Sequence, residues 1–459
     1  MKARQGFSGK AGFIAAAAGG AVGLGNIWRF PFEVGEGGGA AFILIYLVFC
    51  FMLCFPLLVT EIAIGRSSGK NQVAAYPTLG HARWSLLGGF GMLTGVLILS
   101  FYNVVAAWCF GYFIEISMGN FDIGQHFSPF IKDAFKISSY ALVFMLATVY
   151  IVSRGITKGI EKYSKVLMPA LVAIILFITG YSLTLPGACE GIKFYLLPDL
   201  SQISFEMIYS AMGHAFFSLS LGLGAMTTYG SYVKRQDNIL SSAMAITLAD
   251  TGVAFFSGLM LFPLVFSEGL ATDGGPGLIF MALPTAFESL GPTPGVVIGG
   301  LFFMLLSLAA LTSTVSILEI PVSWLSEDFK MGRKRATWTA ALVVLAMGIP
   351  SLLANGHSDI FTHFITYPGS EEPTDFMTFL SDLAGNTFLP AGGFLTAVFT
   401  ALIWKKDNLA SELASANEKL IHRYLSSFVI FSIRYLCPWI LGALFVINLL
   451  KIFFGSSLI

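Results

Sequence analysis

The chain has 459 residues, of which 56% are hydrophobic and 11% are charged, with 26 Lys+Arg against 26 Asp+Glu. A soluble domain carries roughly 25% charged residues, so this chain lacks the charge to cover a soluble surface, and its mean hydropathy of +0.78 agrees. The zero net charge excludes a basic nucleic-acid-binding face at the scale of the whole chain. The composition predicts a polytopic protein of the lipid bilayer.

Eleven apolar runs are long enough to cross a bilayer as helices, which takes about 20 residues each. They predict an all-α membrane protein with about eleven transmembrane helices, and a short charged helix over 405–423 before the last of them. The runs cover roughly 11–34, 40–65, 87–117, 138–154, 160–185, 205–230, 239–267, 295–326, 337–354, 376–404 and 424–454.

The basic residues between these runs predict the orientation, because Lys and Arg are enriched in cytoplasmic loops. With the N-terminus inside, twenty Lys and Arg fall on inner segments and only Lys132, Lys136, Lys193 and Lys451 fall outside. We therefore expect a multi-pass protein of the cell membrane with a cytoplasmic N-terminus. The odd number of helices places the C-terminus outside.

Two of the expected helices contain clusters of glycine. The first runs Gly19-Gly20-Ala21-Val22-Gly23-Leu24-Gly25-Asn26 and the sixth runs Ser218-Leu219-Ser220-Leu221-Gly222-Leu223-Gly224. Such clusters also permit close helix packing, but paired interruptions in corresponding helices of two halves are typical of a transporter's central site. Helices 1 and 6 correspond if helices 1–5 and 6–10 are repeats.

Polar residues lie inside the same spans. Ser and Thr in membrane helices usually bond their own helix, whereas a carboxylate at membrane depth costs at least about 2.5 kcal/mol and needs a partner. Asp250 is therefore the strongest candidate for a functional residue. Carboxylate, hydroxyl and carbonyl oxygens suit a small hard cation. The polar residues are Asn26, Ser218, Ser220, Asp250, Thr312 and Ser313.

Three ordered motifs resemble those of the neurotransmitter:sodium symporter family. They are Gly19 to Pro31, Phe216 to Gly224 and Leu311 to Ser316, and Gly159 and Pro169 match that family's fifth-helix pattern. The resemblance implies the inverted five-helix repeat of the leucine-transporter fold, with discontinuous helices 1 and 6. It also implies sodium-coupled amino-acid uptake, with repeats over 1–185 and 205–404 and an inner linker helix and peripheral helix over 405–459.

The resemblance implies two sodium sites. The first would use the Ala21 carbonyl, Asn26, Ser218, Asp250 and the substrate carboxylate. The second would use the carbonyls of Gly19, Val22 and Ala309 with the hydroxyls of Thr312 and Ser313.

It likewise implies a substrate site beside the two helix breaks. The substrate carboxylate would meet the amides near Leu24 and Gly25 and the Tyr102 hydroxyl, because a helix N-terminus presents free N–H groups to an anion. The ammonium group would meet carbonyls near Ala21, Phe217 and Ser220. The remaining expected contacts are Gly20, Ile98, Ser218, Leu223, Ser313 and Ile317.

The family pattern also implies gates. Phe217 would cover the substrate, and Arg29 would pair with Asp382 or, in a shifted alignment, Asp375. On the inner side Arg4 would pair with Glu327 or its neighbour Asp328, helped by Phe7 and Tyr232. Glu61 is expected to accept hydrogen bonds from the unwound part of helix 6.

Departures from the family pattern suggest the class of substrate and the dependence on chloride. Gly20 stands where an asparagine is common and Leu223 where an aromatic residue is common, which leaves room for a large neutral, hydrophobic or aromatic L-amino acid. Ala254 replaces a serine and His214 a glutamine in the region of the chloride site, and Asp250 supplies a negative charge. We therefore expect chloride-independent transport, while proton counter-transport through Asp250 or His214 stays open.

Two other functions compete with this interpretation. A sodium- or proton-coupled carrier of another small zwitterion or amine, such as an osmolyte, keeps the fold and changes the cargo. A remote alternative is an intramembrane hydrolase, since His214 and Ser218 lie one helical turn apart. We expect a carrier rather than an enzyme, with no nucleic-acid partner and no obligatory protein partner.

Overall fold

The protein is helical throughout the residues described by its computed structural model, which are 6–270, 278–368, 372–414 and 420–454. Within those ranges the only β-type pairing is a single bridge between Ile365 and Thr374. Nine helical spans in them are long and apolar enough to cross a membrane, and a bent pair of helices at the N-terminus adds a tenth. The prediction of an all-helical membrane protein is confirmed.

The continuous spans agree with the apolar runs to within a few residues. Several contain one π-helical turn, labelled η. They are α3–η2–α4 (Ala40–Phe49, Cys50–Cys54, Phe55–Ser68), α6 (Ser85–Ser117), α8 (Ala134–Ser153), η5–α9 (Ile156–Glu161, Lys162–Ser182), α13 (Ile239–Ser267), α16 (Pro292–Glu327), α17 (Arg333–Leu353), α19–η8–α20–η9 (Phe376–Leu380, Ser381–Phe388, Leu389–Val398, Phe399–Trp404) and α22–η10–α23 (Leu420–Phe431, Ser432–Leu436, Cys437–Phe454).

The first expected helix is broken where its glycines cluster. It consists of α1 (Lys10–Ala21), η1 (Gly25–Arg29) and α2 (Phe30–Glu36), and the two parts meet at an angle of 55°. Val22, with a ψ of 111°, carries the backbone out of the helix. The carbonyl groups at the end of α1 and the amides at the start of η1 therefore face the break.

The sixth expected helix is broken in the same way, between α11 (Phe205–Ser218) and α12 (Ala225–Gly230). Ser220, Gly222 and Gly224 all have positive φ angles, of 51°, 88° and 77°. A hydrocarbon environment cannot satisfy the freed backbone groups, and Glu61 Oε1 accepts a hydrogen bond of 2.8 Å from the Gly222 amide. The predicted interruptions and the role of Glu61 are confirmed.

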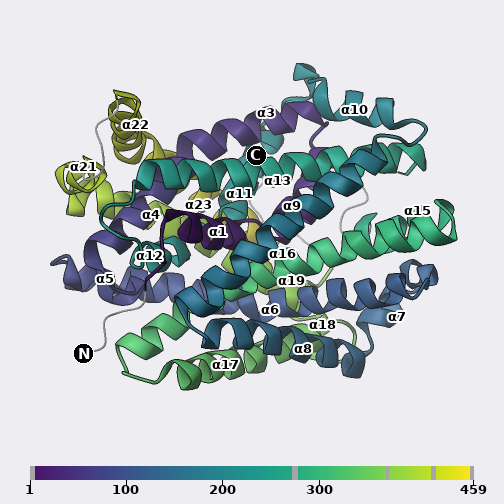
Figure 1. Cartoon of the computed structure of the whole chain (residues 1–459), viewed down its shortest axis with the longest axis horizontal. Helices are drawn as coiled ribbons and strands as arrows, with labels where there is room; N and C mark the ends of the chain where they lie inside the picture. The colour runs from purple at the N-terminus through teal and green to yellow at the C-terminus, as the bar shows by residue number, and fades with distance from the viewer. Residues whose placement is uncertain (1–5, 271–277, 369–371, 415–419, 455–459) are drawn as a thin grey trace.

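Short helices form the connections. They are α5 (Gln72–Thr78), η3 (Ala82–Trp84), η4 (Phe121–Gly124), α7 (Phe127–Ile131), α10 (Ala188–Leu196), η6 (Leu200–Gln202), η7 (Leu278–Ala282), α15 (Leu283–Ser289), α18 (Asp359–Thr362) and α21 (Lys406–Ala414). In Figure 1, α7, α10 and α15 lie at one end of the long axis, while α5, α12 and α21 lie at the other.

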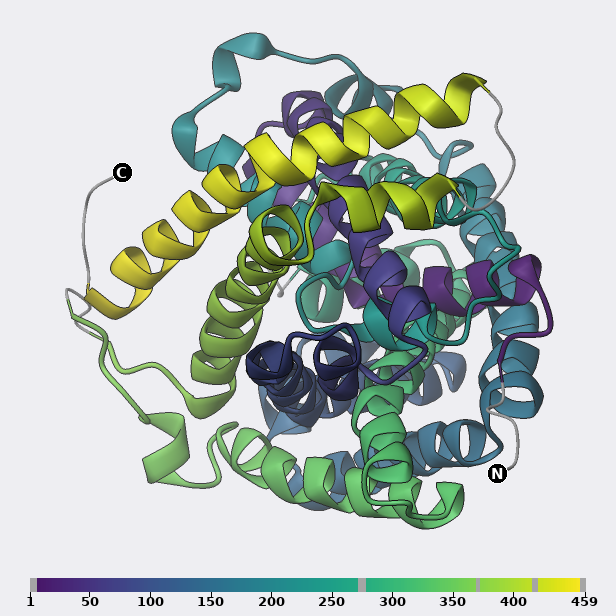
Figure 2. The same cartoon turned by 90° about the vertical axis from the view of Figure 1, so that its left-hand side faces the viewer.

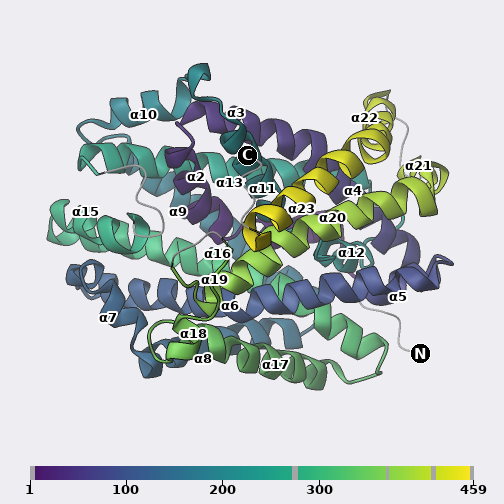
Figure 3. The ribbon, with the colours of Figure 1, turned by 180° about the vertical axis from the view of Figure 1, so that it is seen from behind.

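The broken helices lie inside the bundle. In Figure 1, α1 lies at the centre of the view, and α1 packs against α9, α13 and α16. Figure 2 looks along the bundle and shows the yellow C-terminal helices at its edge. Figure 3 shows α23 beside α20, which agrees with their packing. The breaks are thus held at the core of the protein.

Large apolar side chains cover much of the outer surface. Leu142 and Val143 on α8 and Val166 and Phe177 on α9 are about half exposed or more. Apolar patches of this extent are rare on soluble monomers, so these helix faces are suited to lipid.

Candidate functional site

Asn26, Ser218 and Asp250 form a buried cluster at the junction of the two breaks. The Asn26 amide donates to Asp250 Oδ1 at 2.8 Å and to Ser218 Oγ at 2.9 Å. The Ser218 hydroxyl donates to Asp250 Oδ2 at 2.9 Å. Helices η1, α11 and α13 supply one residue each, and Asn26 and Asp250 are fully buried. The family resemblance implied this grouping, although the three residues lie far apart along the chain.

Two neighbours of this cluster were not fully anticipated. Tyr46 Oη lies 3.5 Å from both Asp250 Oδ2 and Ser218 Oγ. The only signal for Tyr46 in the sequence is its hydroxyl group within an apolar run. His214 packs among the rings of Phe30, Phe42 and Tyr46. Neither of its ring nitrogens has a hydrogen-bond partner among the described residues. Ser218 is bonded to Asp250 instead, so the Ser/His pair that a hydrolase needs is not formed.

A second group of oxygens lies between α1 and α16. The Ser313 hydroxyl donates to the Val22 carbonyl at 3.3 Å, and the Thr312 hydroxyl donates to the Ala309 carbonyl at 3.0 Å. Gly19 faces the same helix, since a Cβ atom placed on it would lie 3.3 Å from Thr312 Cβ. The five residues expected at a second sodium site are thus brought together.

A small cavity of about 30 Å³ lies between the breaks. Ten of the twelve residues expected around the substrate line it. The sequence did not indicate two of the lining residues, Gly23 and Leu389, and Leu389 lies in an apolar run of α20 that carries no distinguishing signal. The full lining is Ala21, Gly23, Gly25, Ile98, Tyr102, Phe217, Ser218, Ser220, Leu223, Ser313, Ile317 and Leu389.

Gly20 and Leu24, the other two expected residues, lie just outside this lining. The Leu24 amide donates to Tyr102 Oη at 3.1 Å, so the amide and the hydroxyl expected to meet a carboxylate are adjacent. A Cβ atom on Gly20 would lie 2.4 Å from Ser316 Oγ. The lack of a side chain at Gly20 therefore gives room to Ser316 and not to the cavity.

A larger cavity of about 320 Å³ lies on the other side of Phe217. Phe217, Tyr102 and Gly25 line both cavities, and Arg29, Phe101 and Met377 line only the larger one. The Arg29 guanidinium carbon is 5.0 Å from the centre of the Phe217 ring, within the range of a cation–π interaction. Phe217 therefore separates the central cavity from the larger vestibule.

The ion pair of Arg29 differs from the expected one. Arg29 Nε lies 3.0 Å from Glu33 Oε1, one turn further along the same helical segment. Asp382 shares a cavity of about 260 Å³ with Arg29 but accepts from the Tyr367 hydroxyl at 3.1 Å and from the Asn386 amide at 3.0 Å. Asp375 caps α19 by accepting from the Met377 and Thr378 amides. The i, i+4 spacing of Arg29 and Glu33 was a signal in the sequence.

On the opposite side, the segment that precedes α1 packs against the other helices. Phe7 contacts the rings of Tyr229 and Tyr232, and Tyr232 Oη donates to Glu319 Oε1 at 2.8 Å. Glu327 accepts from the Asn71 amide and side chain at 3.0 and 3.1 Å. Arg4, the expected partner of Glu327, lies outside the described residues.

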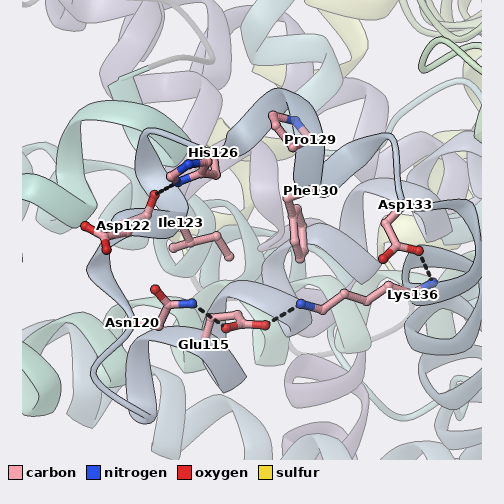
Figure 4. Close-up of a pocket in the computed structure, with 9 residues that line it drawn as sticks. All are labelled: Glu115, Asn120, Asp122, Ile123, His126, Pro129, Phe130, Asp133 and Lys136. Atoms are coloured by element: carbon pink, nitrogen blue, oxygen red, sulfur yellow. Dashed lines mark hydrogen bonds and ion pairs between the residues drawn. The ribbon is translucent and has the colours of Figure 1, made fainter.

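A separate cavity of about 270 Å³ lies near α7, far along the chain from the breaks. Figure 4 shows Glu115 between Asn120 and Lys136, with His126 bonded to the backbone of Asp122. Glu115 is paired with Lys136 and accepts from Asn120, and the cavity includes none of the residues of the central cluster. It is not a candidate for the substrate site.

The fold and the site define a class of protein. Two broken helices that place buried oxygens around a small central cavity define a secondary transporter of the leucine-transporter fold. The signature of the sodium:neurotransmitter symporter family matches residues 4–123 and 125–453. The chain belongs to this family, whose members are transporters and not enzymes, and it is a multi-pass sodium-dependent symporter.

Similar proteins are also named as sodium-dependent transporters. The sodium-dependent transporter YhdH of Bacillus subtilis is 37% identical over 89% of this chain and 90% of its own. A sodium-dependent transporter of Haemophilus influenzae is 31% identical over 98% of this chain and 99% of its own. The crystal structure of MhsT in complex with L-phenylalanine matches with a TM-score of 0.86 and 37% identity, over 96% of this chain and 99% of that one.

Proposed function

We propose that this protein couples the inward movement of sodium to the uptake of a neutral, hydrophobic or aromatic L-amino acid by alternating access. The observation that carries the proposal is the central cavity, where apolar side chains meet the Tyr102 hydroxyl, which accepts a hydrogen bond from the Leu24 amide just outside the lining. The apolar part is Ile98, Leu223, Ile317 and Leu389, with Phe217 as its outer wall. MhsT, with its bound phenylalanine, supports the same class of substrate.

Two sodium ions would bind beside the substrate. The first would use Asp250, Asn26, Ser218 and the Ala21 carbonyl, where a buried carboxylate balances the ion's charge. The second would use the carbonyls of Gly19, Val22 and Ala309 with Thr312 and Ser313. Hard oxygen donors of this kind suit sodium, and a substrate carboxylate near the first ion would link the two binding events.

Binding requires a change in shape. The central cavity of about 30 Å³ is far smaller than the roughly 300 Å³ at the lower end of ligand pockets. Phe217 and Arg29 would move to admit the substrate from the larger cavity, and Asp382, which lines a cavity together with Arg29, would receive Arg29 when they return. The repeats 1–185 and 205–404 would then rock against each other, with 405–459 at the periphery.

We propose that the N-terminus is cytoplasmic and the C-terminus extracellular, in the cell membrane. The distribution of twenty inner against four outer basic residues supports this orientation. The larger cavity next to Phe217 then faces outside, and the contacts of Phe7 with Tyr232 close the inside.

Transport is proposed to be independent of chloride, because Asp250 supplies the negative charge that balances sodium. Human and rat taurine transporters that are 27–28% identical over 80% of this chain are sodium- and chloride-dependent by name. Here Ala254 offers no hydroxyl, and His214 lies among aromatic rings.

The test is uptake into proteoliposomes under an imposed sodium gradient, with a panel of labelled amino acids. We expect uptake of leucine, phenylalanine or tryptophan only with sodium outside, and equal uptake when gluconate replaces chloride. Equal uptake with and without a sodium gradient contradicts the coupling. Strong glycine or taurine uptake that leucine and tryptophan fail to displace contradicts the substrate class and favours the osmolyte-like alternative.

A further inference from the structure

A basic cavity lies at the N-terminal end of helix α9, away from the central site. Its volume is about 470 Å³, the largest among the cavities described above. The mechanism of transport makes no use of its lysines. It is lined by Ser8, Arg154, Thr157, Lys158, Glu161, Lys162 and Lys165.

The charges of this cavity do not balance. Glu161 is its only acid, is buried, and is already paired with Lys165 at 2.5 Å. Arg154, Lys158 and Lys162 are exposed, and within the described ranges none of them forms an ion pair with a carboxylate. Lys158, Lys162 and Lys165 follow one another at spacings of four and three residues, which gathers them on one side of the helix. Three positive charges therefore remain available to an anion.

The surroundings place this cavity at the border between lipid and water. The Arg154 guanidinium lies 4.0 Å from the centre of the Tyr150 ring, and Tyr150 contacts Tyr163. Tyrosines are enriched at the headgroup level of membranes. Beyond them the apolar surface begins, where Leu146 is 42% exposed and Val166 is 64% exposed.

We propose that this cavity binds the phosphate headgroup of an anionic phospholipid, whose acyl chains lie against the exposed faces of α8 and α9. Basic pockets between transmembrane helices on the cytoplasmic side suit such headgroups, and phosphate accepts several charge-assisted hydrogen bonds at once. The proposal rests on the orientation proposed above and not on the identity of the transported amino acid. It adds a lipid ligand that the transport cycle does not itself require.

Native mass spectrometry of the detergent-purified full-length chain tests this proposal. We expect dioctanoyl phosphatidylglycerol to be retained at least fivefold more than dioctanoyl phosphatidylcholine. The double variant Lys158→Gln/Lys162→Gln should lose this preference, and Lys158→Arg/Lys162→Arg should keep it. The matched control is Lys334→Gln/Arg335→Gln, which removes two exposed basic side chains of α17 and should keep the preference.

The outcomes distinguish a lipid headgroup from free phosphate, and lipid binding from transport. Loss of the preference in the control, or equal retention of both lipids by the unsubstituted chain, overturns the site. Full displacement of the lipid by an equal concentration of inorganic phosphate identifies a free-anion site and overturns the lipid assignment. Hydrogen exchange provides a second readout, and added phosphatidylglycerol should slow exchange at residues 154–165 in the unsubstituted chain but not in Lys158→Gln/Lys162→Gln. Neither readout uses transport, so an absence of uptake leaves this test intact.

Discussion

The carboxylate of Asp250 is the residue on which the sodium proposal depends most directly. It lies at membrane depth and accepts hydrogen bonds from Asn26 and Ser218, while no basic side chain pairs with it among the described residues. A carboxylate in that setting needs a cation. In Asp250→Asn we expect the sodium concentration for half-maximal uptake to rise at least tenfold, a loss of about 1.4 kcal/mol.

Thr251→Ala is the matched control for Asp250→Asn. Thr251 is the next residue of α13 and is also buried, but its hydroxyl donates to the Thr247 carbonyl of its own helix at 2.8 Å. Its removal should leave the sodium dependence unchanged. Equal effects of the two substitutions, measured as initial uptake rates over a sodium titration, would contradict the ion site and indicate a general loss of packing.

The second ion site depends on a hydroxyl. In Thr312→Ala we expect about a fivefold rise in the sodium requirement, since one oxygen ligand is worth roughly 1 kcal/mol. Ser307→Ala is the control, because Ser307 lies on the same helix and its hydroxyl donates to the Phe303 carbonyl of that helix. The same sodium titration measures both, and an unchanged requirement in Thr312→Ala would remove this residue from the site.

At the scale of residues, the sequence could identify side chains but not their geometry. Asp250 and Asn26 stand out because a polar group in an apolar helix is costly. Leu389 could not be found in this way, because an apolar residue of a membrane helix looks the same whether it faces lipid, core or cavity. Arg29 was expected to contact Asp382 across the bundle, and the nearer Glu33 of its own segment binds it instead.

The break in helix 6 is the element with the tightest backbone requirement. Gly222 has a φ of 88°, and a Cβ atom there would lie 2.2 Å from the Leu389 carbonyl oxygen. Gly222→Ala should therefore lose ~1 kcal/mol or more from backbone strain alone, and further from the collision. We expect a lower melting temperature of the detergent-purified protein and a loss of uptake.

Gly180→Ala is the matched control for Gly222→Ala. Gly180 lies inside α9, and a Cβ atom there would meet nothing within 4 Å. An alanine inside a helix is favoured over glycine by roughly 0.5–1 kcal/mol. Its melting temperature should stay the same or rise, and equal losses in both variants would contradict the steric argument.

Glu161, in the π-helical turn that precedes α9, helps to hold the segment that precedes α1. Glu161 accepts from the Ser8 amide at 2.8 Å and pairs with Lys165, and the Thr157 hydroxyl donates to the Gly6 carbonyl. Hydrogen bonds to charged groups contribute about 1.5–3 kcal/mol. In Glu161→Gln we expect roughly tenfold faster hydrogen exchange at residues 6–11, as the inner closure loosens.

Glu190→Gln is the control for this contact, since Glu190 is an exposed acid on α10. Its substitution should not change the exchange of residues 6–11. Unchanged exchange in Glu161→Gln would show that the aromatic contacts of Phe7 hold this segment without the acid.

At the scale of elements, the sequence predicted the lengths of the helices and the position of both breaks, because glycine clusters and hydrophobic runs are local properties. Beyond the contacts implied by the family resemblance, it did not predict the partners across the bundle. The contact of Ser8 with Glu161 spans 153 residues and depends on how α1 and α9 pack. Gly159 and Pro169 were recognised as a pattern, and the π-helical turn that contains Gly159 was not.

The whole molecule is organised around the separation of two cavities by the side chain of Phe217. Phe217 lies between a cavity of about 320 Å³ and one of about 30 Å³, and the contacts of Phe7 and Tyr232 close the opposite side. Although the chain has no net charge, its basic residues are concentrated in alternate connections between the helices. If this distribution of basic residues reflects the membrane orientation, the larger cavity opens outside the cell.

A native cysteine provides the test of this orientation. Cys189 on α10 is exposed, whereas Cys50, Cys54, Cys109 and Cys437 are buried. Because α10 is expected outside, a membrane-impermeant maleimide applied to intact cells should label the unsubstituted protein, and Cys189→Ser should remove the signal. In the Cys189→Ser background, Lys334→Cys on α17 should react only after permeabilisation. Labelling of Lys334→Cys on intact cells, together with no labelling of the native Cys189 in the unsubstituted protein, would reverse the orientation. It would place the larger cavity, Arg29 and Phe217 on the cytoplasmic side.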